Sequence, residues 1–93
     1  MPDITPEMFS EDIQRLPNFQ ALLNRFRSSP RLAQDIFDFT KDGKGKIRLS
    51  DHFSNEYHPP ANGQPAFIDL NPGDLTGDFL AATVLAHELG HAL

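Results

Sequence analysis

Apolar side chains in the first forty residues recur at the three- and four-residue spacing of amphipathic helices. The clearest stripe has the spacing i, i+3, i+4 and i+7 and consists of Phe19, Leu22, Leu23 and Phe26. Two further stripes, each preceded by a capping residue and a proline, predict helices at about residues 6–15 and 30–38. The N-terminal part of the chain is therefore predicted to be helical, and it carries no recognisable catalytic chemistry.

The pattern changes after the third helix, where lysine and glycine alternate in a segment typical of turns. Apolar and polar residues then alternate at 46–50, which predicts a short strand. Residues 51–65 are rich in proline and are predicted to form a surface loop, and 66–70 form a second short strand. A last apolar helix is expected from residue 79 to Leu93. The predicted fold class is α+β, with N-terminal helices, a small sheet edge and a final helix.

Composition limits the possible functions. A chain of 93 residues is long enough for one domain, which we predict to span residues 1–93. The formal net charge of -5 and the lack of a basic stripe make nucleic acid an unlikely partner class. No apolar segment is long enough for a membrane span, and no cleavable signal peptide is evident. Export through a signal that is read without cleavage stays an open alternative.

The last helix contains the chemistry-bearing segment His87-Glu88-Leu89-Gly90-His91. Two histidines four residues apart project from the same helical face, so His87 and His91 can bind one metal ion. Since the chain has no cysteine, a metal must be held by histidine or carboxylate, and neutral imidazole suits Zn²⁺. Glu88 lies about 100° around the helix from His87, beside the metal. There it can act as the general base that accepts a proton from the attacking water.

The segment at residues 86–93, Ala-His-Glu-Leu-Gly-His-Ala-Leu, resembles the active-site helix of zincin metallopeptidases. A longer stretch, from Ser29-Pro30 at the start of a helix to the run Phe-Ile-Asp-Leu-Asn-Pro at 67–72 ahead of the last helix, resembles the NleD-type effector peptidases of bacterial pathogens. The resemblance implies zinc-dependent cleavage of peptide bonds in a protein or peptide substrate, within the first half of a zincin domain. It also implies that residues 66–70 form an exposed edge strand to which an extended substrate adds.

An active zinc site needs three protein ligands and an open position. The third zincin ligand normally follows the helix, but here the sequence stops two residues after His91. We therefore expect the chain to be part of a longer enzyme and to lack peptidase activity by itself. Upstream residues that could replace the third ligand are His52, Glu56, His58 and Asp69, although solvated or hydrogen-bonded side chains are the more ordinary expectation there.

Two other classes of function stay open at this level. A catalytically silent zincin-like module would keep the last helix for packing and use the fold for binding. A helical adaptor would dock a partner through the first forty residues. Metal binding would separate a zincin-type site from an adaptor.

Overall fold

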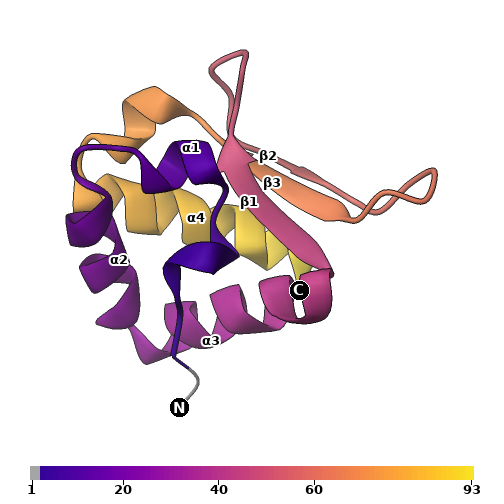
Figure 1. Cartoon of the computed structure of the whole chain (residues 1–93), viewed down its shortest axis with the longest axis horizontal. Coiled ribbons are helices and arrows are strands. Elements are labelled where there is room, and N and C mark those ends of the chain that lie inside the picture. The colour runs from indigo at the N-terminus through magenta and orange to yellow at the C-terminus, as the bar shows by residue number, and fades with distance from the viewer. Residues whose placement is uncertain (1–2) are drawn as a thin grey trace.

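The two clearest apolar stripes form helices α2 (Phe19–Arg27) and α3 (Pro30–Thr40), as predicted. They are seen in a computed structural model that describes residues 3–93, so that Met1 and Pro2 of the predicted domain lie outside the described part (Figure 1). All four apolar residues of the α2 stripe are buried. The cap predicted for α3 is also present, because Oγ of Ser29 accepts a hydrogen bond of 3.3 Å from the Leu32 amide.

The helix predicted at residues 6–15 is divided into two short pieces. A 3-10 turn, η1 (Pro6–Met8), is followed by α1 (Glu11–Gln14), and the extended residue Phe9 separates them. Phe9 forms a parallel bridge with Ile47, and its ring lies 5.8 Å from that of Phe26. Burial of an aromatic ring and pairing of the backbone with the sheet thus override local helix propensity.

The sheet has three strands, β1 (Gly45–Leu49), β2 (Glu56–His58) and β3 (Ala66–Leu70), in the order β1-β3-β2. β3 is parallel to β1 and antiparallel to β2. Two expectations are corrected by this topology. The segment 51–65 is not entirely a loop, because it contains β2, and β3 is the central strand of the sheet. β2 therefore occupies the edge position that had been expected for residues 66–70.

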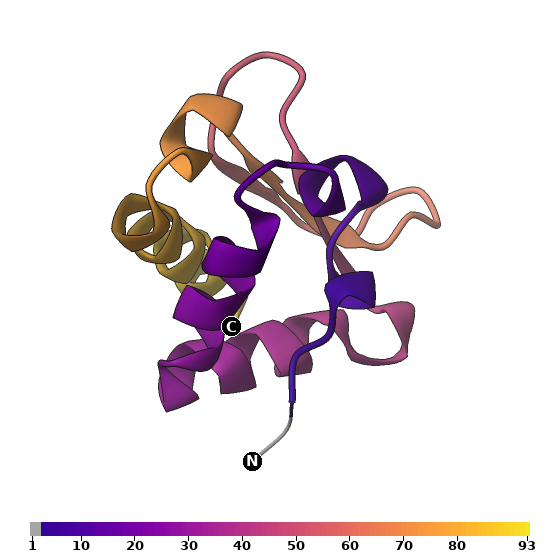
Figure 2. The same ribbon diagram turned by 60° about the vertical axis from the view of Figure 1, so that its left-hand side comes forward.

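Helix α4 (Asp78–Ala92) packs against α2, α3, β2 and β3. Its residues Ala81, Leu85 and Leu89 are fully buried and belong to the same core as Ile68 and Leu70 of β3. Figure 2 shows α4 next to α2 at the border of the molecule.

The remaining elements are the 3-10 turns η2 (Lys41–Gly43) and η3 (Pro72–Leu75). The α+β class is confirmed by four helices and a small mixed sheet within residues 3–93, and no helix in this range meets the length and apolarity required to cross a membrane.

Substitution of Gly45 by alanine should destabilise the junction of α3 and β1. A methyl group at this position would lie 2.4 Å from the carbonyl oxygen of Phe39 and 2.7 Å from two atoms of its ring. Overpacking of this kind typically costs about 1–3 kcal/mol, and urea denaturation of Gly45→Ala would measure it. Gly90→Ala is the matched control, because its methyl group would meet no atom within 4 Å. In the helix interior it should stabilise the protein by about 1 kcal/mol, so equal midpoints for the two variants would contradict the packing described.

Candidate metal centre

His87 and His91 lie one turn apart on the exposed side of α4. Their Nε2 atoms face each other at 3.2 Å, and their rings are 4.8 Å apart between centroids. The helix sets this juxtaposition, since residues i and i+4 stand on one face. The two predicted metal ligands are therefore brought together.

The distance between the two nitrogens fits a shared zinc ion. Zinc–nitrogen bonds of about 2.0–2.1 Å at a tetrahedral angle place two ligand nitrogens about 3.3–3.4 Å apart. The 3.2 Å between Nε2 of His87 and Nε2 of His91 is close to this edge length. The donor chemistry and the spacing thus both suit a metal such as Zn²⁺.

Glu88 lies between the histidine face and the core. The residue is only 6% exposed, while His87 before it is exposed. Its carboxylate makes no hydrogen bond or ion pair with the other described residues, and it is not one of the fully buried atoms that lack a partner. The stem of Glu88 is thus held by the core, while its oxygens keep access to solvent. The buried stem therefore holds the residue against the core, and no other described side chain competes for its carboxylate.

The upstream candidates for a third ligand gather elsewhere. In β3 the side chains of Ala66, Ile68 and Leu70 face the core and α4, so Asp69 points to the opposite face of the sheet. Glu56 of β2 pairs with Asp69 in register and shares that outer face. No group of three or more histidine, cysteine or carboxylate residues within residues 3–93 is arranged to hold a metal. These candidates therefore do not complete the site formed by His87 and His91.

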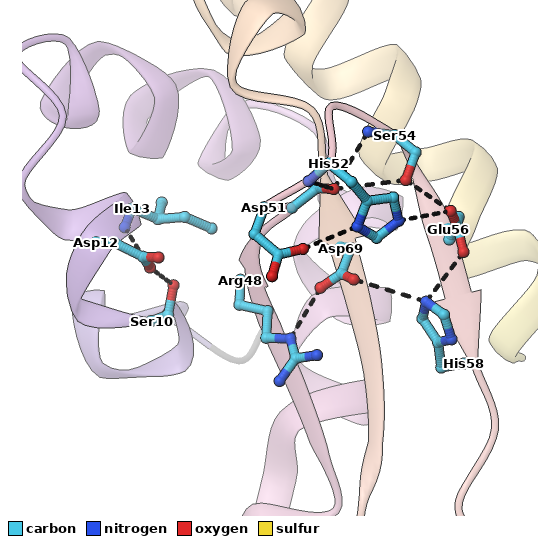
Figure 3. A network of polar contacts seen from close by, with 11 residues as sticks. Ser10, Asp12, Ile13, Arg48, Asp51, His52, Ser54, Glu56, His58 and Asp69 are labelled. Atoms are coloured by element: carbon cyan, nitrogen blue, oxygen red, sulfur yellow. Dashed lines mark hydrogen bonds and ion pairs between the residues drawn. The ribbon is translucent and has the colours of Figure 1, made fainter.

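Instead, Asp69 is the centre of a polar network on the outer face of the sheet (Figure 3). It is only 4% exposed, and its Oδ1 accepts a hydrogen bond of 2.8 Å from Nε of Arg48. The Arg48 guanidinium lies 3.7 Å from the ring centroid of Phe67, and the ring of His58 stacks on Phe67 at 4.3 Å. Nε2 of His58 is buried, 3.2 Å from Oε2 of Glu56 and 3.6 Å from Oδ2 of Asp69, without a hydrogen bond of good geometry. The network binds the three strands together through their outer side chains.

Part of this network could have been found from the sequence. The period of two in 66–70 places Phe67 and Asp69 on one face, which the alternation alone reveals. The contributions of Glu56 and His58 could not be found in this way, because they depend on the strand β2, which was predicted to be loop.

The loop before β2 is held by His52. Its Nδ1 lies 2.8 Å from Oδ1 of Asp51 and its Nε2 lies 3.1 Å from Oε1 of Glu56 (Figure 3). The hydrogen bonds with Asp51 and then Glu56 raise the pKa of His52 above its ordinary value. The hydrogen bond with His52 lowers the pKa of Asp51, and those from Ser54 and then His52 lower the pKa of Glu56.

These pKa shifts predict that the loop is most stable at an intermediate pH. The raised pKa of His52 makes a contribution to stability that is complete below about pH 6.5 and is lost as pH rises through the folded value. The lowered pKa values of Asp51 and Glu56 make a contribution that is lost on acidification below about pH 4. An NMR titration should give His52 a midpoint above 6.5, and Asp51→Asn should lower it, whereas the distant Asp35→Asn should not. A midpoint unchanged by Asp51→Asn would show that the two side chains are not paired.

An open pocket of about 620 Å³ lies between η1, α1 and β1. It is lined by residues such as Glu7, Glu11, Lys46 and Arg48, and by neither histidine of α4. The candidate metal ligands are therefore on the exposed surface of α4 and not in this pocket.

Comparison of the chain with known protein families, with curated proteins and with solved structures found no significant match.

Proposed function

We propose that this chain carries the metal-binding helix of a zinc-dependent peptidase. His87 and His91 are the zinc ligands in this proposal, and Glu88 is the general base. The observation that supports it most strongly is the 3.2 Å distance between the two Nε2 atoms. The residue that follows His87, Glu88, has a carboxylate without a hydrogen bond to the other described residues. The choice of peptide bonds as the substrate class comes from the resemblance of residues 86–93 to zincins.

In this proposal, the chemistry is divided between the two histidines and Glu88, and buried leucines of α4 position them. A zinc ion supplies Lewis acidity, which polarises a substrate carbonyl and acidifies the attacking water. Glu88 accepts the proton of that water and delivers it to the leaving amine. Leu85 and Leu89, both fully buried, hold the helix so that the carboxylate and the imidazoles keep their relative positions.

A silent zincin-like binding module is the second candidate. It is supported by one observation, namely that residues 3–93 place two metal ligands together and not three. The adaptor alternative is less well supported, because the apolar stripe of α2 that would dock a partner is buried in the core.

The two candidates differ in one assay. The complete gene product, loaded with zinc, would be incubated with a mixture of peptides, and the products would be identified by mass spectrometry. A peptidase should produce cleavage that a chelator abolishes and added zinc restores. Zinc binding through His87 and His91 without any cleavage would favour the silent module.

A further inference from the structure

The outer face of α4 is mostly apolar, and the Arg25 guanidinium lies over one end of it, 3.9 Å from the ring centroid of Phe79. Its exposed positions are Phe79, Leu80, Thr83, Ala86, His87, Gly90, His91 and Leu93. Phe79 is 71% exposed and Leu80 49%. The two acidic residues of the helix do not contribute to this face, because Asp78 pairs with Arg25 at 2.9 Å and Glu88 is buried. An exposed and mostly apolar patch of this kind marks a contact surface.

The histidine pair lies within this face, and its neighbours are small. Ala86 and Gly90 precede His87 and His91 by one position each, and Thr83 lies one turn before His87. A Cβ atom added at Gly90 would meet nothing within 4 Å. Small residues allow the backbone of a second helix to approach closely, so this part of α4 can receive another helix beside the imidazoles.

We propose that two copies of this chain pack α4 against α4 and hold one zinc ion between them with His87 and His91 of both copies. This inference rests on the zinc binding that the proposed function assigns to the two histidines. A second copy is the occupant that the observations favour, because a two-fold axis supplies the same nitrogen pair twice and so gives the four ligands of a closed tetrahedral site. It also places two mostly apolar faces together.

Charge explains why the metal is required. Each chain has a formal net charge of -5, so two chains repel each other at long range. A divalent cation at the contact reduces this repulsion and links the two helices. The resulting site has no open position, and structural zinc sites of this kind do not hydrolyse substrates. The dimer is therefore a silent form of the metal centre.

The test is a zinc titration of the 93-residue chain, followed by analytical ultracentrifugation and by metal analysis after removal of free ion. In chelator the chain should be a monomer. With zinc it should become a dimer that is complete at one zinc per two chains, with an association constant raised by roughly 100-fold when free zinc is 100 times its dissociation constant. His91→Ala should remove this response, whereas His52→Ala on the outer face of the sheet should retain it.

A second variant separates the dimer from the metal site. Gly90→Leu keeps both histidines, and its Cβ would meet no atom within 4 Å in the monomer, but it places a bulky group between the two helices. It should fold, as circular dichroism would verify, and should bind zinc without forming a dimer. One zinc per monomeric wild-type chain, lost in His91→Ala, would overturn the dimer and leave the proposed function intact. A dimer that persists in chelator would also overturn it, and zinc binding that is unaffected by His91→Ala would overturn both proposals.

Discussion

Replacement of Glu88 by glutamine should leave zinc binding unchanged and lower the rate of peptide hydrolysis by about 10²- to 10⁴-fold. The amide has nearly the same size as the carboxylate, so the buried stem keeps its packing, but it cannot accept a proton from water. The measurement is the turnover of a cleaved peptide by the complete gene product, with zinc content determined on the same samples. The loss should appear mainly in kcat, because the proton is transferred in the transition state.

Glu56→Gln is the matched control for this prediction. It makes the same chemical change in a carboxylate that lies on the outer face of the sheet, away from α4. Its turnover should stay near that of the unmodified protein. Hydrolysis by Glu88→Gln at a rate comparable to this control would exclude Glu88 as the general base.

Truncation of Leu85 to alanine should lower the free energy of unfolding by about 2–5 kcal/mol. Leu85 is fully buried and lies on the face of α4 that packs against the core. Removal of its side chain leaves a cavity that the surrounding elements cannot fill completely. Because small domains are stable by only about 5–15 kcal/mol, this loss is a large share of the total.

Leu80→Ala tests whether that cost arises from burial. It is the same substitution in the same helix at a position that is 49% exposed. Its effect should be within about 0.5 kcal/mol, as for other surface positions. Chemical denaturation of both variants provides the comparison, and similar losses at the two positions would show that α4 is not packed as described.

The parts of the fold with strong periodicity were predictable from the sequence. The stripe on α2, the cap and proline at the start of α3, and the strand at 66–70 all appear at the expected places. A run of several apolar positions is enough to distinguish the helical period of about 3.6 residues from the strand period of two. The α+β class follows from these elements.

The predictions that were wrong concern features that are determined by tertiary contacts. Phe9 interrupts a local helix in order to pair with Ile47, which lies far from it in the sequence. β2 has only three residues, too few for a period to be recognised in a segment rich in proline. The central position of β3 depends on β2, so one missed strand also reversed the prediction of the sheet edge.

The candidate site was predictable to the extent that it is local. The spacing of His87 and His91 within one helix sets the distance between their nitrogens, and no other element is needed for this. A third ligand must come from another segment, and spacing along the chain contains no information about it. The same limit applies to Asp69, whose partner Arg48 is contributed by a neighbouring strand.

In the proposed metal centre, Nε2 of His87 and Nε2 of His91 bind one zinc ion. X-ray absorption spectroscopy at the zinc edge, on the zinc-loaded chain and on His87→Ala and His91→Ala, tests it most directly. We predict imidazole nitrogen ligands at about 2.0–2.1 Å in the unmodified chain, loss of the bound zinc in both variants, and an unchanged spectrum for His58→Ala. An unchanged zinc spectrum and content in His87→Ala and His91→Ala would contradict the claim.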